Sequence, residues 1–312
     1  MTEETQQAPP APAPERWELW TLVALSLAIL MVLTYAIAFM RLGTPSIYAY
    51  ALGIRAFGFM TVPLMFLGLL RTVFRPPAIR RSRTIAFVAL TFTGILGHKP
   101  MFSAPVSTED WTSTHTYRLP FEGEWTTIAG GDDMDRNYHA TMPTLRYAYD
   151  FTVVKDGATF RLDGARADDY FVFGQPVVAP VDGKVVRVED GIADATPGTT
   201  DAAFFGNHIV VEVGPAEYLY LAHLKKDSIE VKVGENIKAG QLLAEVGNSG
   251  YSIAPHLHVH LQNTTEFPNG ESLPLRFSNY AANGKPVALG MPLGSIDTSK
   301  PSGERVAQMP IQ

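Results

Sequence analysis

A long uncharged stretch constrains this chain more than any other feature. No residue from Leu19 to Met40 is charged, and most are Leu, Ala, Val, Ile or Met. About 20 such residues span the hydrocarbon core of a bilayer. The tail before it is acidic rather than basic and the run is longer than that of a signal peptide, so we expect an uncut anchor. Residues 1–18, rich in Pro, Ala, Gln and Glu, are expected to be disordered.

Two further apolar stretches follow, at about residues 45–70 and 84–102. Arg55 interrupts the first of them, and an arginine inside a span is costly unless it faces protein or reaches the interface. A span that began after Arg55 would be short. The last stretch reaches spanning length only if the chain through Phe102 enters the membrane with it. We expect three transmembrane helices within residues 19–99 or just beyond, with two helices as the alternative.

The number of spans decides where the rest of the chain lies. The loop between the second and third stretches has no acidic residue and five arginines, which are Arg71, Arg75, Arg80, Arg81 and Arg83. Short loops rich in Lys and Arg stay in the cytoplasm, so the tail at residues 1–18 is expected to be cytoplasmic as well. Three spans would carry everything after about residue 100 to the outer side, whereas two would leave it in the cytoplasm.

After residue 100 the sequence changes to short runs that alternate or are rich in β-branched residues. Gly, Pro, Asn and Asp separate these runs, and helical periodicity is hard to find. Runs this short and regular predict an all-β domain rather than alternating strands and helices. The runs are residues 147–154, 176–188, 207–214, 217–224, 240–247 and 256–262. Residues 100–116 are expected to be a linker, and residues 298–312 a loose tail.

Composition limits the chemistry of the chain. The net charge of -6 argues against nucleic acid as a partner, because binding to backbone phosphates requires clustered Lys and Arg. There is no cysteine, so a metal site has to use His, Asp or Glu. The eight histidines are therefore the residues to follow.

Three of these histidines, His256, His258 and His260, alternate with apolar residues in the sequence APHLHVHLQ. Side chains alternate between faces in a strand, so the three would share one face at a spacing of about 6.5–7 Å. Two such residues can address one centre, one as a metal ligand and one reaching an atom bound to the metal. The alternative is a half-buried strand whose solvent face happens to carry histidine.

Further candidates lie outside this strand. His223 is near the end of the run YLYLAHL, and NYHATMPTLRYAYDF supplies His139 and also Asp150 in an otherwise apolar strand. A zinc site without cysteine uses three His or carboxylate ligands and keeps a fourth position for water. His139, Asp150 and one histidine of the 256–258 pair would supply that set. A lone aspartate in such a strand is also common as a turn or edge residue.

Together these segments resemble the M23 metallopeptidases, the lysostaphin- and LytM-like peptidoglycan endopeptidases, over residues 117–297. The resemblance rests on NYH…YAYDF, FGQPVVAPVDGKVVRVEDG, GNHIVVEV, YLYLAHL, VKVGENIKAGQLLAEVGNSG and APHLHVHLQ, in the family's order. It implies an antiparallel β-sheet domain of the LytM/lysostaphin type with one Zn²⁺ per chain. It further implies that the zinc ligands are His139, Asp150 and His258, and that the catalytic pair is His223 and His256.

Two positions depart from the family's pattern. The usual motif is His-x-x-x-Asp, whereas His139 and Asp150 are eleven positions apart with Pro143 between them. We interpret this spacing as an insertion in one branch of the family. His260 stands where the commoner pattern has Glu, and we expect it to be a rim residue rather than a ligand.

The resemblance implies a membrane-anchored zinc endopeptidase that hydrolyses peptide cross-links or stem peptides of peptidoglycan. It would be a multi-pass protein of the bacterial cytoplasmic membrane with its catalytic domain outside. One alternative is an inactive LytM-like regulator of cell-wall hydrolases, but such domains usually lack ligands, and all five positions here hold acceptable residues. The other is a biotinyl- or lipoyl-like membrane adaptor, which would need a modifiable hairpin lysine or flanking coiled coils. A regulatory protein partner is left open.

Overall fold

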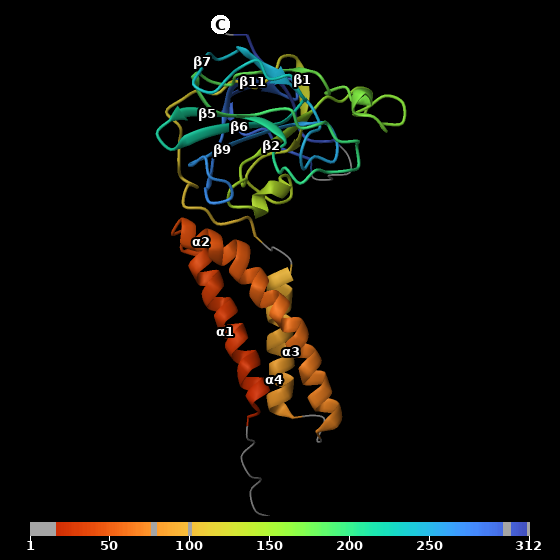
Figure 1. The fold of residues 1–312 in the computed structure, drawn as a ribbon. Helices are drawn as coiled ribbons and strands as arrows, with labels where there is room; N and C mark the ends of the chain where they lie inside the picture. The colour runs from red at the N-terminus through yellow and green to blue at the C-terminus, as the bar shows by residue number, and fades with distance from the viewer. Residues whose placement is uncertain (1–16, 76–79, 99–101, 296–300, 311–312) are drawn as a thin grey trace, which may run out of the picture. The chain divides into compact units, whose positions relative to one another are not determined.

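The computed structural model describes the chain except for residues 1–16, 76–79, 99–101, 296–300 and 311–312. The chain divides into two compact units (Figure 1). One comprises Met1–Ala36 and Leu52–Pro100 and is helical, and the other comprises Ile37–Ala51 and Met101–Gln312 and contains all the described strands. The change near residue 100 from long apolar stretches to short alternating runs therefore coincides with a change from helices to strands.

The helices follow the apolar stretches of the sequence. They are α1 (Leu19–Phe39), α2 (Thr44–Tyr48), a π-helical turn (Ala49–Gly53), α3 (Ile54–Phe74) and α4 (Arg81–His98). Arg55 lies in the first turn of α3, so it does not interrupt that helix. In the helical unit, small residues let α3 and α4 approach closely: a Cβ added to Gly97 would lie 2.3 Å from the Cα of Gly58. Such contacts between small residues are typical of helices packed in a membrane.

The expected number of independent spans has to be corrected. Among the described residues, two helical stretches are long and apolar enough to cross a membrane, Leu19–Phe39 and Thr44–Phe74. Helix α4 does not qualify because Arg81 and Arg83 occupy its first turn and its 18 residues end at His98. The expected third span also relied on residues 99–101, which lie outside the described part. Of the tail at residues 1–18, only Trp17 and Glu18 are described.

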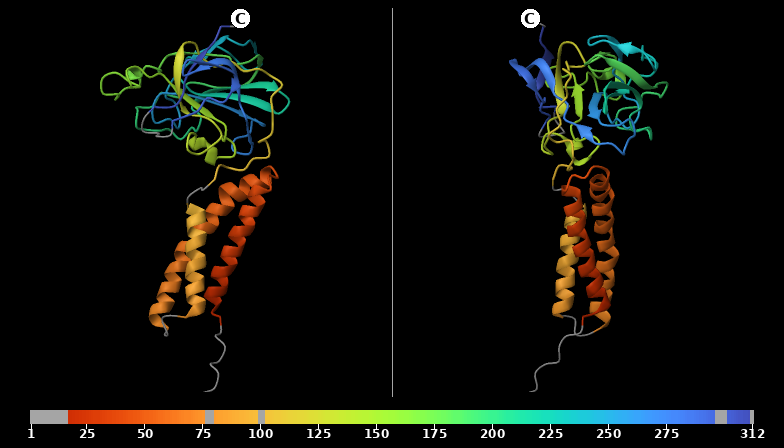
Figure 2. Two further views of the ribbon diagram at one scale, coloured as in Figure 1. Left: turned by 180° about the vertical axis from the view of Figure 1, so that it is seen from behind. Right: turned by 90° about the vertical axis from the view of Figure 1, so that its left-hand side faces the viewer.

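The second unit is an antiparallel β-domain, as the sequence predicted. Its main sheet has 11 strands in the order β12-β11-β13-β1-β2-β9-β6-β5-β4-β7, with β10 paired to β9, and β3 and β8 form a separate pair. Figure 2 shows the blue β11 and β12 and the cyan β7 on opposite sides of the domain. The strands are β1 (Glu124–Ala129), β2 (Tyr149–Thr152), β3 (Pro176–Val178), β4 (Gly183–Glu189), β5 (Asn207–Gly214), β6 (Glu217–Leu224), β7 (Asn236–Ile237), β8 (Leu242–Glu245), β9 (Leu257–Gln262), β10 (Ser272–Leu273), β11 (Phe277–Ala282), β12 (Lys285–Gly290) and β13 (Arg305–Gln308).

Strand β9, which carries His258 and His260 and directly follows His256, lies between β2 and β6. One of its faces places Leu257, Val259 and Leu261 in the main core, where all three are fully buried. The other face is not open to solvent, because His258 and His260 are almost completely buried as well. A half-buried strand with a solvent-facing row of histidines is therefore excluded.

The domain has different limits from those expected. Strand β13, which was assigned to a loose tail, pairs with β1 on one side and β11 on the other. Before Tyr117, part of the expected linker packs on the domain: Ala104 and Val106 are fully buried, and the backbone N–H of Ser107 donates to Glu271. These contacts could not be predicted from the sequence, because the segments are short, lack periodicity and pair with residues far away in the chain.

Candidate metal and catalytic site

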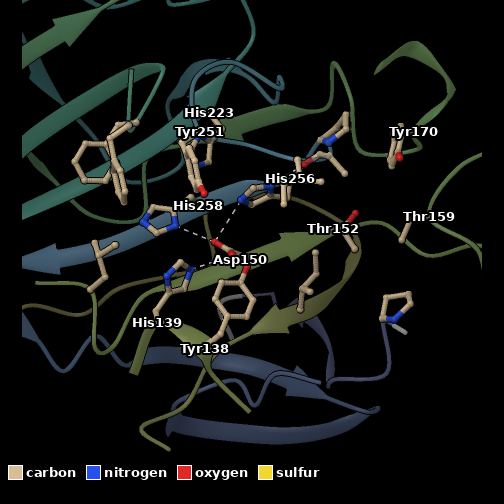
Figure 3. A pocket seen from close by; sticks show the side chains of 18 of the residues that line it. Tyr138, His139, Asp150, Thr152, Thr159, Tyr170, His223, Tyr251, His256 and His258 are labelled. Carbon is tan, nitrogen blue, oxygen red and sulfur yellow. Dashed lines mark hydrogen bonds and ion pairs between the residues drawn. The ribbon is translucent and has the colours of Figure 1, made fainter. Parts of the chain in front are cut away.

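The five candidate residues come from four separate segments and line one cleft (Figure 3). The registers of β2, β9 and β6 explain much of this. Asp150 lies directly opposite His258 across the β2–β9 pair, and Ala222 lies opposite His258 on the other side, so that His223 follows at the end of β6. Neighbouring antiparallel strands bring such opposed side chains within contact distance.

Asp150 is the centre of the cluster. Its Oδ2 atom lies 3.0 Å from Nε2 of His139, and its Oδ1 atom lies 2.8 Å from Nδ1 of His258. Nε2 of His256 lies 3.5 Å from the same Oδ1. The Tyr138 hydroxyl also donates to Oδ2. The carboxylate is 1% exposed, so its neighbours are imidazole rings rather than water.

Backbone carbonyl groups orient the two remaining histidines. Nδ1 of His223 lies 2.9 Å from the carbonyl oxygen of Ser249, and Nδ1 of His256 lies 2.8 Å from that of Ala254. A carbonyl oxygen can only accept, so Nδ1 carries the hydrogen in both rings and Nε2 is left with a lone pair. The two ring centroids are 4.9 Å apart. The pair therefore presents two nitrogen atoms that can accept a proton.

His223 is held in a backbone conformation that non-glycine residues rarely adopt, with φ of 58°. Two hydrogen bonds fix it there. Its N–H donates to Phe205 at 3.0 Å, and its carbonyl oxygen accepts from the N–H of Gly247 at 3.0 Å. Backbone strain that the surroundings maintain in this way is characteristic of functional sites.

Burial and mutual contacts set the charge states of the cluster. Burial alone would raise the pKa of the Asp150 carboxyl, but the rings of His139 and His256 hold that pKa well below its usual range. Burial lowers the pKa of His258 to about 4, although the Asp150 carboxylate acts in the opposite direction. Burial and the neighbouring imidazoles also lower the pKa of His223 well below its usual value. Near pH 7 the site thus has an ionised carboxylate beside neutral His223 and His258.

The eleven-residue spacing does not separate His139 from Asp150. His139 lies in a short 3-10 helix, Tyr138–Thr141, and the chain then turns back to enter β2. The fully buried side chain of Asn137 holds this loop together. Its amide nitrogen lies within hydrogen-bonding distance of three carbonyl oxygens, those of Gly131, Arg146 and Ala148, and its Oδ1 accepts from the N–H of His139.

Sequence reasoning missed Asn137 and Tyr138 as functional candidates. Asparagine directly before a helix is a common cap, and that signal was present in NYH. His260 was placed wrongly: it is fully buried rather than on the rim, and its Nδ1 lies 3.0 Å from Nε2 of His258. Its burial could not be predicted from neighbouring residues, because the covering residue Phe205 comes from a distant loop.

The cleft has a volume of about 640 Å³. Its walls include the apolar side chains of Met142, Leu145, Phe204, Tyr251 and Ile253. Asp150 is the only Asp, Glu, Lys or Arg among the described residues that line it. The charge needed to hold a cation is therefore concentrated at one point.

Two groups of three side chains could hold a metal ion. One is His139, Asp150 and His258, and the other is His223, His256 and His258; within each group the donor atoms lie within 4.8 Å of one another. The first group combines two imidazoles with a buried carboxylate, which is a donor set that Zn²⁺ accepts at catalytic sites with an open fourth position. Its three members are all buried, whereas His256 is partly exposed. These residues fit a zinc ion.

Comparison with known proteins gives matches in the same part of the chain. Residues 167–272 match the model of Peptidase family M23. This range includes the three candidates His223, His256 and His258, whereas His139 and Asp150 precede it.

The relatives include glycyl-glycine endopeptidase ALE-1 of Staphylococcus capitis, which is 36% identical over 118 residues, or 37% of this chain and 29% of the relative. Lysostaphin of Staphylococcus simulans is 35% identical over 120 residues, or 38% of this chain and 22% of the relative. The chain therefore spans less than a third of the length of either relative. Among solved structures, the catalytic domain of Staphylococcus simulans lysostaphin matches with 22% identity and a TM-score of 0.28, over 48% of this chain and 88% of that domain. Residues 167–272 thus carry an M23 peptidase family domain, and lysostaphin is among its homologues.

Proposed function

We propose that this chain is a membrane-anchored zinc endopeptidase that hydrolyses peptide cross-links of peptidoglycan. The observation that carries the proposal is the position of His139, Asp150 and His258 beside His223 and His256 in one cleft. An inactive regulator would not require these five side chains to converge. The biotinyl- or lipoyl-like adaptor is not favoured either, because it would leave the buried histidine cluster without a role.

In this proposal His139, Asp150 and His258 hold one zinc ion. When bound, zinc would polarise a carbonyl group and lower the pKa of a bound water to about 7. The set that contains Asp150 is favoured over the three-histidine set because it brings a negative charge to a buried cation. It also leaves His223 and His256 available for proton transfer.

His223 and His256 would act as the proton-transfer pair. Each has Nδ1 committed to a backbone carbonyl, so Nε2 is the atom that can take a proton from the attacking water or return one to the leaving amine. Once protonated, an imidazole can also donate to the developing oxyanion. The backbone of His223 is the more rigidly held of the two, which suits a group that has to meet the reacting atoms at a fixed distance.

The substrate class rests on the relatives and on location. ALE-1 is named a glycyl-glycine endopeptidase, and a peptide cross-link of the cell wall is the corresponding substrate for this chain. That substrate lies outside the cytoplasmic membrane, so the β-domain has to lie there too. Regulation by another protein remains compatible with this proposal.

Helix α4 supports the outer location, although it does not qualify as an independent span. Its inward face is mixed, since Ser82, Arg83 and Thr93 are buried together with Ala86, Leu90 and Gly97. Its outward face is apolar, and Ile85, Val88, Phe92 and Ile95 are exposed. A helix with an apolar outer face can cross a membrane beside partner helices that cover its polar residues.

The decisive experiment measures zinc content and cleavage on the same purified full-length chain in detergent, with Asp150→Asn as a matched variant of equal size. We expect one zinc per chain, new amine ends in purified peptidoglycan, and loss of both in the variant. A topology reporter fused after Gln312 should report the outer side. A cytoplasmic signal from that reporter would remove peptidoglycan as the substrate, and a wild-type chain without zinc would refute the enzyme itself.

A further inference from the structure

Beyond the proposed ligand set, the β9 strand holds a continuous row of polar side chains on one face. His258, His260 and Gln262 follow each other at two-residue spacing, and each is at most 2% exposed. Nδ1 of His258 faces Asp150 at 2.8 Å, and its Nε2 lies 3.0 Å from Nδ1 of His260. The row therefore begins at the proposed metal position and runs away from it into the protein.

The far end of the row has two unpaired polar atoms. The amide nitrogen of Gln262 donates to the carbonyl oxygen of Thr264 at 2.7 Å. Among the described residues, Oε1 of Gln262 and Nε2 of His260 are both buried and have no hydrogen-bond partner. The amide oxygen can only accept. A hydrogen on Nε2 of His260 would therefore give these successive residues of the row a donor and an acceptor for each other.

The proposed metal sets the hydrogens at the other end of the row. A histidine binds a metal only through an unprotonated nitrogen, so a metal-bound His258 that offers Nδ1 beside Asp150 carries its hydrogen on Nε2. Nε2 of His258 lies 3.0 Å from Nδ1 of His260, which would then accept that hydrogen bond. A neutral His260 would in turn carry its own hydrogen on Nε2.

We propose that His260 and Gln262 are positioning residues that fix the tautomer and orientation of His258, so that Nδ1 is the atom offered to the metal. This inference rests on the proposed function, because it assigns His258 as a ligand. Neither residue belongs to a group that could hold the metal directly. Their role is to accept and relay the hydrogen bond that a metal-bound histidine donates from its second nitrogen.

The packing around His260 supports a fixed orientation. The ring is stacked against Tyr220, with centroids 4.5 Å apart and planes at 17°, and against Phe205, at 5.4 Å and 26°. Both neighbours are buried. These two rings also contact each other, with centroids 5.3 Å apart. An imidazole packed against such a pair cannot turn freely, so its Nδ1 stays directed at His258.

The test compares His260→Leu with His260→Asn in the full-length chain. The two replacements have the same branched shape, but only Asn has an oxygen where Nδ1 of His260 accepts. Zinc affinity is measured by competition with a chelator, and peptidoglycan cleavage is recorded separately. We expect His260→Leu to bind zinc about 10- to 100-fold more weakly, and His260→Asn to recover most of that loss. Gln262→Leu should show a smaller loss in the same direction.

His208→Leu is the matched control, since His208 also stacks on Tyr220 but does not line the cleft. It should leave zinc affinity unchanged. Equal losses in His260→Leu and His260→Asn would show that the ring acts by packing alone and would overturn the inference, as would unchanged affinity in both. If His260→Leu does not fold, the zinc affinities of His260→Asn and Gln262→Leu are each compared with that of the wild type, and these two comparisons decide the question. A wild-type chain that binds zinc without cleaving peptidoglycan refutes the proposed function, but the zinc affinities of the variants still decide this inference. A wild-type chain that binds no zinc overturns both the proposed function and this inference.

Discussion

Replacing Asn137 with alanine tests how the protein holds the first proposed ligand across an eleven-residue spacing. Asn137 is fully buried, and its amide bridges three carbonyl oxygens of the loop between β1 and β2 while its Oδ1 accepts from the N–H of His139. The side chain therefore joins residues near both ends of this loop. Asn137→Ala would leave these groups buried without a partner.

The size of the effect follows from the hydrogen bonds lost. The amide has two hydrogens, so it makes at most two good donor bonds at a time, in addition to the bond that Oδ1 accepts. A buried polar group left without its partner costs about 1–3 kcal/mol. Allowing for relaxation, we expect a local loss of roughly 2–5 kcal/mol, which corresponds to a loop-opening equilibrium raised by roughly 30-fold to a few thousand-fold.

Amide hydrogen exchange in the full-length chain measures this local opening directly. Protection should fall over residues 131–150 and stay unchanged in β5 and β6, and zinc affinity should fall with it because His139 loses its fixed position. Asn207→Ala is the matched control. Asn207 is equally buried, but it bridges Ile192 and Leu224 instead. Asn207→Ala should therefore lose exchange protection around residue 192 rather than over residues 131–150. Full protection of residues 131–150 in Asn137→Ala would refute the reasoning.

Three further predictions concern the site and the helices. His258→Ala should abolish zinc binding and cleavage, whereas His223→Ala should keep the zinc and lose cleavage; zinc analysis beside a turnover assay checks this, and zinc loss in His223→Ala would reassign the roles. Tyr138→Phe keeps the ring but removes the hydroxyl that donates to the central carboxylate, and it should weaken zinc retention about tenfold in chelator competition; unchanged retention would show that the hydroxyl does not orient the ligand. Gly97→Leu would put a side chain where even an added Cβ would lie 2.3 Å from the Cα of Gly58, so it should lower the thermal stability of the helical unit, and an unchanged melting temperature would contradict this packing.

Several features could be predicted from the sequence because they depend on neighbours in the chain. The alternation around His258 predicted a strand with three histidines on one face; β9 contains His258 and His260, whereas His256 directly precedes it. The short runs separated by Gly, Pro, Asn and Asp predicted an all-β domain, and its main sheet is antiparallel. Side-chain alternation and turn chemistry are local properties, so they are visible in any window of a few residues.

Other features could not be predicted because their partners lie far away in the chain. His260 was expected on a rim, yet Phe205 and Tyr220 cover it. Residues 305–308 were expected to belong to a loose tail. So short a segment becomes a strand only because β1 and β11 pair with it on either side. A third span was expected because the apolar stretch was extended through Phe102, whereas helix α4 ends at His98 and has Arg81 and Arg83 in its first turn.

The sequence by itself determined the two-part organisation of the chain, the β-domain and the residues from which a metal site could be built. Only the tertiary structure decided that His139 and Asp150 meet despite their spacing, with Nε2 and Oδ2 3.0 Å apart. That proximity depends on the loop that Asn137 closes and on the register that sets Asp150 opposite His258. Both are long-range constraints, and sequence spacing alone says nothing of distance once a chain folds back on itself.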